Sequence, residues 1–404
     1  MEKTVFPQAD KPSIAILPFV KMSGDPKQQY FCDGMSEQII TGLSQGPYIY
    51  VTSRTSSFAY RDKNMTAQQI AEELGVRYLL EGSVQREDDI VRIHAQLIDG
   101  QNGNHIWAKR YDREYEGLFA LQDEITMDVM SSLNVKMTGF TLASLSYSKP
   151  KNLEAYEHYL RGVYYHLGRK KQDIPLVKEA FTEALKIDPD YGPAYRFLGF
   201  AYCDEIIYRT TKTPEKSLEK AEQMAQKAFE VDPDYPPYTL WNQISRLKKD
   251  YDDAILNAER GIEQEPNEPY RYFFLSLAQR DANLFEDAIS PMETALQLAR
   301  FRPVNFLNQL AWSYFGNKQF HEANQLFDEI LNRDPKSFYG FLAYLGLAAS
   351  CELNGDHERA TWAAESVMRR NPKFSLDYMY KNSTLKDGPF KETVYDAFRK
   401  AGLK

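Results

Sequence analysis

The stretch "VNFLNQLAWSYFGNKQFHEANQLFDEILNRDP", residues 304–335, carries the pattern that decides the fold. Apolar residues recur at helical spacing in two successive runs, which predicts two amphipathic helices. The first run holds Leu307, Leu310, Ala311 and Tyr314, the second holds Ala323, Phe327 and Ile330, and Pro335 ends the second helix. Small residues at Ala311 and Ala323 allow the two helices to approach closely. One such hairpin cannot bury its apolar face alone, so the stretch predicts a stack of similar hairpins.

A proline at the end of a helical stretch recurs along the chain. Dipeptides ending in proline occur at 188–189, 232–233, 265–266, 302–303, 334–335 and 371–372, so the prolines are spaced 44, 33, 37, 32 and 37 residues apart. Units of about 34 residues that end in proline resemble tetratricopeptide repeats. Six repeats are predicted, at about 153–189, 192–233, 236–266, 270–303, 304–335 and 339–372. The repeat region is placed at 153–374, and 375–404 is predicted to be a capping helix.

The first third of the chain has a different pattern. Strands are predicted at 14–19, 48–54, 76–88, 89–100 and 105–114, and helices at about 33–44, 66–75 and 118–133. Asp33 is the expected N-cap of the first helix, and Thr66 and Gly75 are the expected ends of the second. This order predicts an α/β domain at 12–140, a mixed sheet with helices packed on it. The polar stretch 141–152 is the expected linker to the all-α solenoid.

Several blocks of this region resemble one known module. "PSIAILPFVKMSGDPKQQYFCDGMSEQIITGLS", "ELGVRYLLEGSVQREDDIVRIHAQLIDGQNGNHIWAKRYDRE" and "LFALQDEIT" are similar to the TolB-like N-terminal domain. That module accompanies tetratricopeptide repeats in bacterial signalling proteins, including the region downstream of the catalytic domain in class III adenylate/guanylate cyclases. The resemblance implies an α/β fold with a regulatory or interaction role, and it supplies no catalytic residues.

The first strand, turn and helix could belong to a phosphate-binding loop or to a scaffold. A Walker loop needs GxxxxGK[ST] and a dinucleotide site needs GxGxxG, and neither pattern occurs. Asp25 and Asp33 would also repel an anion at that turn. We therefore interpret residues 12–44 as scaffold.

The charge, the cysteine content and the apolar runs of the chain argue against several classes of binding partner. Residues 1–150 carry 15 basic and 19 acidic side chains, and the remainder carries 34 and 38, so each part has a net charge of −4. Neither part has a basic pole, which argues against nucleic acid as a partner. Cys32, Cys203 and Cys351 lie far apart and form no CxxC or Cys/His cluster, so no metal and no cofactor are expected. No apolar run approaches the ~18–20 residues that cross a bilayer. A cytoplasmic location is expected, or an extracytoplasmic one if a membrane helix precedes the chain in a longer protein.

The first helix of each tetratricopeptide repeat lines the concave face of the array. The resemblance therefore assigns partner contacts to Arg196 and Phe200 in the second repeat, Gln243 and Arg246 in the third, Tyr270, Phe273 and Arg280 in the fourth, and Asn305, Asn308 and Trp312 in the fifth. Asparagine amides can bind the backbone of an extended peptide, and arginine can pair with a carboxylate. The alternative is that these side chains are solvated or contact the N-terminal domain.

Three functions stay open at this point. The first is a non-catalytic regulatory module that binds a protein or peptide on the repeats. The second is an enzyme, but the FxDI pattern that often opens a class III cyclase domain is absent. A fragment of a cyclase without its catalytic domain is compatible with that absence. The third is a small-molecule sensor, which would need an apolar pocket lined by a few converging polar groups.

Overall fold

The computed structural model describes residues 11–22, 29–44, 49–87, 89–115, 118–133, 135, 151–168, 170–266, 268–299, 302–381 and 383–404. The chain forms two compact units, Met1–Leu240 and Trp241–Lys404. The turn expected between the first strand and the first helix lies almost wholly outside the described residues, as does most of the expected linker at 141–152.

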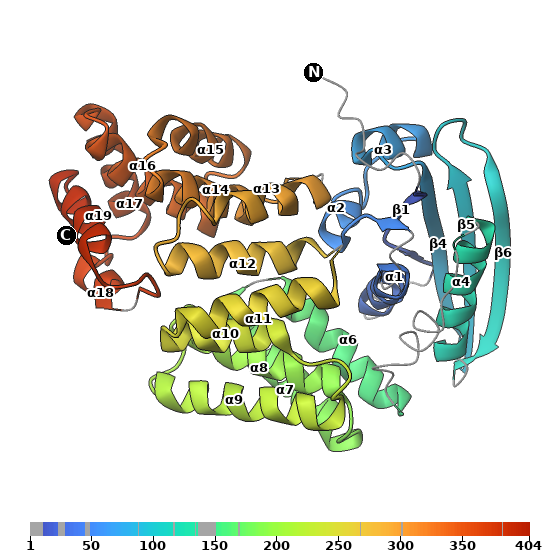
Figure 1. The fold of residues 1–404 in the computed structure, drawn as a ribbon. Coiled ribbons are helices and arrows are strands. Elements are labelled where there is room, and N and C mark those ends of the chain that lie inside the picture. The colour runs from blue at the N-terminus through green and yellow to red at the C-terminus, as the bar shows by residue number, and fades with distance from the viewer. Residues whose placement is uncertain are drawn as a thin grey trace. The chain divides into compact units, whose positions relative to one another are not determined.

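The first unit contains a six-stranded mixed sheet (Figure 1). Its strands are β1 (Ser13–Ile16), β2 (Val20–Lys21), β3 (Tyr50–Val51), β4 (Tyr78–Glu87), β5 (Ile90–Asp99) and β6 (His105–Glu114). The order is β3-β1-β4-β5-β6, and β2 also pairs with β4. β1 is parallel to β3 and β4, whereas β4, β5 and β6 form an antiparallel meander with a register shift between Leu97 and Ile98. The three long predicted strands are confirmed.

Alternate residues of the central strands face two different cores. On one face, Ile14, Ile16 and Leu80 belong to a cluster that includes residues of α1 (Gln29–Ser44) and α4 (Leu118–Ser132). On the other face, Ala15 and Leu79 belong to a smaller cluster with residues of α3 (Ala67–Leu74). This alternation follows from the two-residue period of a strand. Helices α1 and α4 therefore cover one face of the sheet, and α3 covers the other face at β1 and the start of β4.

The residues predicted to end α3 do so in the structure. Thr66 accepts from the backbone N–H of Gln69, and the Gln69 side chain accepts from the backbone N–H of Thr66, which completes a capping box. Gly75 ends the helix with φ of 59°, a left-handed conformation that glycine adopts without a Cβ penalty. Both predicted ends of this helix are confirmed.

Two other local predictions were wrong. Asp33 is not an N-cap, because α1 begins at Gln29 and Asp33 lies buried within the helix. Its carboxylate pairs instead with Arg61 at 2.5 Å and accepts from the Gln29 side chain at 2.8 Å. The strand predicted at 48–54 shortens to β3, and Ser53 caps the short helix α2 (Arg54–Phe58).

Two helix hairpins complete the first unit, α6 (Leu153–Leu167) with α7 (Ile174–Ile187) and α8 (Gly192–Ile207) with α9 (Pro214–Val231). The α6–α7 hairpin packs closely at Gly162, where an added Cβ would lie 2.7 Å from the Phe181 ring. The first proline spacing, 44 residues, is the longest of the five, and the helices between those prolines, α8 and α9, have 16 and 18 residues.

The first hairpin shares its core with the sheet. Tyr156, Tyr159 and Leu160 of α6 belong to the same buried cluster as the residues of β1, α1 and α4. Gly34 of α1 leaves room for Leu160, and Glu157 accepts hydrogen bonds from Arg86 of β4 and from Tyr115 just after β6. Hence the start of the repeat region and the α/β part form one structural body.

The second unit continues the helix hairpins. Its helices are the end of α10 (Tyr238–Lys248), α11 (Tyr251–Gln264), α12 (Pro269–Asp281), α13 (Ile289–Leu298), α14 (Val304–Gly316), α15 (Phe320–Arg333), α16 (Phe338–Leu353) and α17 (His357–Arg370). Buried alanines such as Ala311, Ala323 and Ala360 lie in one core with larger residues such as Phe306 and Phe327. The small residues therefore permit close helix approach, as the sequence pattern predicted.

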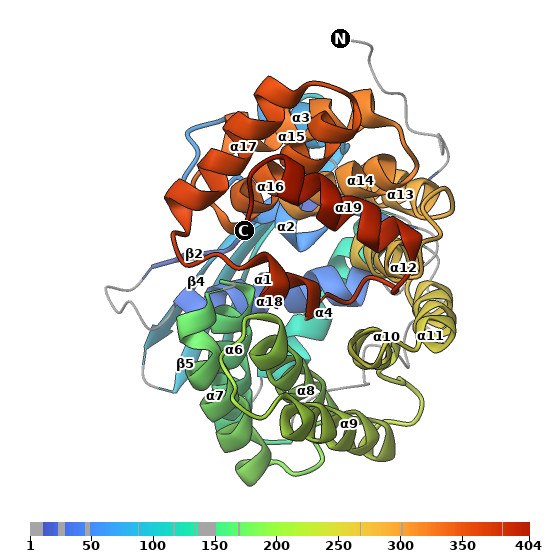
Figure 2. The ribbon, with the colours of Figure 1, turned by 90° about the vertical axis from the view of Figure 1, so that its left-hand side faces the viewer.

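The C-terminal segment forms two helices, α18 (Leu376–Lys381) and α19 (Pro389–Lys400), where one was expected. Gly388 (φ 151°) and Pro389 at the first turn of α19 separate them. α19 packs beside α16 (Figure 2) and contributes Val394, Tyr395 and Phe398 to the core. This end of the array is closed by apolar contact.

Candidate peptide-binding surface

Aromatic packing fixes the spacing between α12 and α14. The Phe306 ring of α14 is fully buried, stacks on Phe273 at a centroid distance of 5.1 Å, and meets Tyr270 edge-on at 5.0 Å. Tyr270 and Phe273 remain half-buried, so part of each side chain is exposed. Both were predicted as partner contacts, and the structure gives both a packing role as well.

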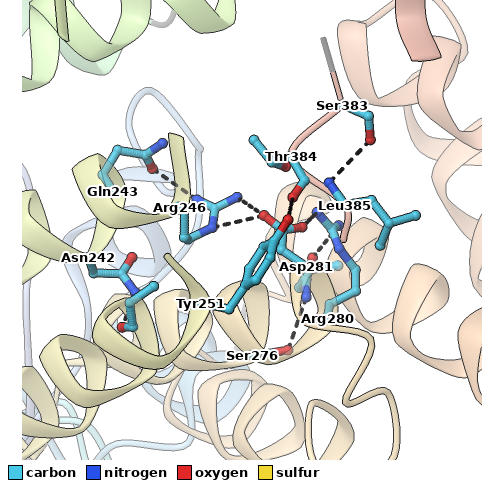
Figure 3. A network of polar contacts seen from close by, with 12 residues as sticks. Asn242, Gln243, Arg246, Tyr251, Ser276, Arg280, Asp281, Ser383, Thr384 and Leu385 are labelled. Carbon is cyan, nitrogen blue, oxygen red and sulfur yellow. Dashed lines mark hydrogen bonds and ion pairs between the residues drawn. The ribbon is translucent and has the colours of Figure 1, made fainter. Parts of the chain in front are cut away.

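A buried ion network links the last turns of α10 and α12 (Figure 3). Arg246 donates from Nε at 3.0 Å and from Nη2 at 2.7 Å to the Asp281 carboxylate, and its Nη1 donates to Gln243 at 3.0 Å. Arg280 donates to the other oxygen of Asp281 at 2.8 Å and to Gln309 of α14 at 2.6 Å. One carboxylate therefore holds two arginines from neighbouring repeats.

The electrostatics of Asp281 follow from this geometry. Burial opposes ionisation of the carboxyl group, but the charges and hydrogen bonds of Arg246 and Arg280 outweigh it and hold the Asp281 pKa below its ordinary value. The carboxylate is therefore charged at neutral pH. Arg246 and Gln243 are 5% and 6% exposed, so most of their surface is committed to this network.

Two asparagines on α14 each have a side-chain polar atom without a hydrogen-bond partner. Asn308 is 6% exposed and its Oδ1 has no hydrogen-bond partner, and the Nδ2 of half-buried Asn305 likewise has none. A buried polar atom without a partner costs free energy, on the order of 1–3 kcal/mol. Trp312, one turn further along, is half-buried and packs edge-on against Phe315 and Phe327 at 5.4 and 5.7 Å. These three residues combine unfilled hydrogen-bonding capacity with aromatic surface.

The remaining two predicted residues belong to the first unit. Arg196 donates to the Tyr235 carbonyl at 3.2 Å, pairs with Asp232 at 3.8 Å and lies 4.5 Å from the Tyr235 ring centroid. Phe200 lies 6.2 Å from the His166 ring and 6.4 Å from the Phe197 ring. Both are half-buried, and the role of all ten residues in binding a partner stays a prediction.

Sequence reasoning missed Asp281, Gln309 and Tyr251, which lie beside the predicted set. Asp281 directly follows the predicted Arg280, so an adjacent acidic residue at the end of a first helix was the available signal. Gln309 likewise follows Asn308 and donates to Ser276 at 3.1 Å. Nothing in the local sequence indicated Tyr251.

Two short motifs of serine enzymes occur in the chain, GxSxG at 42–46 and SxxK at 146–149, 148–151, 217–220, 245–248 and 383–386. Ser245 lies on α10 and donates to Asp253, and Ser383 lies between α18 and α19. A nucleophile elbow places its serine on a strand-to-helix turn, whereas Ser44 is the last residue of α1. Ser217 lies on α9 and donates to Glu205 at 2.8 Å, and residues 146–149 lie outside the described part. The structural context that would support catalysis is therefore missing at Ser44 and Ser217.

The structure also bears on metal and membrane binding. Within the described residues, no group of three or more His, Cys, Asp or Glu side chains is placed to hold a metal ion. In the same part of the chain, every helix is too short or too polar to span a bilayer. The three cysteines are buried and unpaired with one another.

No family model matches the chain. It is 39% identical over 241 residues to "Putative adenylate cyclase 3" of Rhizobium meliloti (strain 1021), which is 59% of this chain and 41% of that protein. The chain thus spans less than half the length of this relative.

Two solved structures are similar in part. The Cut9–Hcn1 assembly of the APC/C matches with a TM-score of 0.48 and 15% identity over 70% of this chain and 52% of the other. YrrB, described as a TPR protein with an unusual peptide-binding site, matches with a TM-score of 0.35 and 16% identity over 51% of this chain and all of the other. Because both scores are below 0.5, the tetratricopeptide character of the repeats rests on the helix hairpins of this chain.

Proposed function

We propose that the chain is a non-catalytic regulatory module of a bacterial signalling protein, and that it binds an extended peptide segment of a partner protein on the first helices of its repeats. The observation that carries this proposal is the pair of unpartnered amide atoms on Asn305 and Asn308 beside the half-buried Trp312. Asn305 Nδ2 is a donor and Asn308 Oδ1 is an acceptor, and both atoms are buried, so an extended segment would satisfy them once the two side chains turn outward.

The similarity to a cyclase relative supports a place in a larger signalling protein. The matched region covers 41% of that relative, so the remainder would supply the output activity. We assign residues 12–140 to the TolB-like domain on the blocks of sequence that resemble it. The absence of a basic pole supports a protein partner rather than nucleic acid.

Transmission through the first unit follows from its shared core. Because α6 packs into the same cluster as α1, α4 and the sheet, a shift of the first hairpin would be felt by the α/β part. Partner binding that shifts α6 would therefore bias the arrangement of the α/β part. The test is to measure hydrogen exchange in α1 and α6 with and without the partner. Unchanged exchange rates in both helices would contradict this step.

The binding test compares three forms of the full chain. The triple variant Asn305→Ala/Asn308→Ala/Trp312→Ala removes the amides and the indole. The control His321→Ala/Glu322→Ala/Gln325→Ala changes three exposed residues on α15, the second helix of the same repeat. A protein captured from the source lysate by the native chain is purified, and its affinity for each form is measured by calorimetry. We expect at least a tenfold loss for the triple variant, because a central aromatic anchor alone is often worth about 2 kcal/mol.

The control should bind like the native chain. Equal binding by all three forms would show that the working surface lies elsewhere and would reject the proposed site.

A further inference from the structure

The segment between α18 and α19 binds to the rest of its unit as a peptide ligand would. We call residues 383–387 the strap; it has no helical or strand structure. Tyr251 donates its hydroxyl to the Thr384 carbonyl at 2.9 Å, and the Lys386 backbone N–H donates to the Asp281 carbonyl at 2.7 Å (Figure 3 draws the Tyr251 contact). The Asp387 carboxylate pairs with Lys249 at 3.1 Å and with the buried Lys391 of α19 at 2.7 Å. Main-chain groups and one charge therefore hold the strap, which is how an extended peptide is recognised.

The strap meets the ion network that lies between two repeats. Asp281 accepts the strap N–H with its carbonyl while its carboxylate holds Arg246 and Arg280. Two further residues border the same site, Lys249 from the turn after α10 and Tyr251 from the start of α11. Arg246, Arg280 and Asp281 hold one another without the strap, so this part of the site would persist if the strap left. The Lys249 ammonium and the Tyr251 hydroxyl bond to strap atoms and would be open to another peptide.

The strap buries little apolar surface of its own, and its charged link to α19 is the pair between Asp387 and Lys391. Lys386 and Asp387 are exposed, and the other strap residues are only half-buried. α19 by contrast is anchored by Val394, Tyr395 and Phe398, which are almost fully buried. Segments with little buried apolar surface open locally at low cost.

We propose that Lys249, Tyr251 and the Asp281 carbonyl form a binding site for an extended acidic peptide, and that the strap occupies this site in the free chain. The matching peptide offers a backbone carbonyl, a backbone N–H two residues later and a carboxylate on the next residue. This inference rests on the proposed function, because the site adjoins Arg246 and Arg280, two of the residues predicted to contact a partner. A partner that binds there must displace the strap, which makes the strap an internal competitor.

The test uses the full chain and a dye-labelled peptide, STLKDGPF, that copies residues 383–390. Lys386→Pro deletes the N–H that bonds to Asp281, and Lys386→Ala is its matched control because it keeps that N–H. In fluorescence anisotropy we expect Lys386→Pro to bind the peptide about tenfold more tightly than the native chain or Lys386→Ala. Adding Lys249→Ala and Tyr251→Phe to Lys386→Pro should remove this gain, and a peptide with asparagine for its aspartate should bind more weakly.

Folding is checked by hydrogen exchange, in which Lys386→Pro should lose protection at 383–388 and keep it in α19. Equal affinity for Lys386→Pro and Lys386→Ala, or no binding to any form, would overturn the proposal. So would tight binding that survives Lys249→Ala/Tyr251→Phe. Peptide binding that survives Asn305→Ala/Asn308→Ala/Trp312→Ala keeps this inference separate from the proposed partner site.

Discussion

Replacing Asp281 by asparagine is expected to destabilise the second unit by about 3–5 kcal/mol, because it leaves two arginines without their shared anion. Asp281 and Arg246 are almost fully buried, so water cannot replace the lost charge. Asparagine keeps the size of the side chain, so the loss reports charge rather than a cavity. The measurement is denaturant-dependent hydrogen exchange of peptides from α10 to α13, which gives the free energy of unfolding of this part of the second unit.

Asp287→Asn is the matched control, since Asp287 is exposed and lies six residues further along. It should change the free energy of unfolding by no more than about 0.5 kcal/mol. An equally small change in the free energy of unfolding for Asp281→Asn would mean that water solvates the two arginines. The network would then not hold the two repeats together.

The same carboxylate predicts a pH dependence. Its pKa is lowered in the folded chain, since the two arginines outweigh the cost of burial. The unfolded chain therefore binds a proton more readily, and the stability from this group is present above the ordinary aspartate pKa of about 3.9 and is lost as pH falls through the lower folded value. The stability gap between the native chain and Asp281→Asn should narrow below about pH 4.

The sequence predicted the parts of the fold that depend on neighbouring residues. Prolines and paired alanines indicated helix hairpins, and the Thr66 and Gly75 signals located α3, because caps and close helix contacts depend on residues a few positions apart. The long strands were equally visible, since a half-buried strand alternates along its own length.

Contacts between distant residues were not predictable in this way. Asp33 meets Arg61 across 28 residues, Arg246 meets Asp281 across 35, and Tyr251 meets Thr384 across 133. Each partner alone resembles an ordinary surface residue, so spacing carries no signal for the pair. The predicted surface residues Arg246 and Gln243 therefore proved to be buried in a network that includes an unpredicted carboxylate.

Tyr159→Ala is expected to destabilise the first unit by about 3–5 kcal/mol, the range for deleting a large buried aromatic side chain. The Tyr159 ring lies 4.9 Å from the Tyr191 ring, and 5.8 Å from those of Phe181 and Phe197. It joins α6, α7 and α8 within the cluster that also holds the sheet. Tyr159→Phe keeps these ring contacts and should lose less than half as much stability.

The pattern of the loss matters more than its size. If the first hairpins and the α/β part share one cooperative core, hydrogen exchange should accelerate together in α1, β4 and α6 to α8. Tyr164→Ala, on the exposed face of the same helix at 46% exposure, should leave all of them unchanged. Loss of protection confined to α6, α7 and α8 would mean that the sheet folds independently. In that case a signal received on the repeats would lack a rigid path to the N-terminal region, and the proposed transmission would fail.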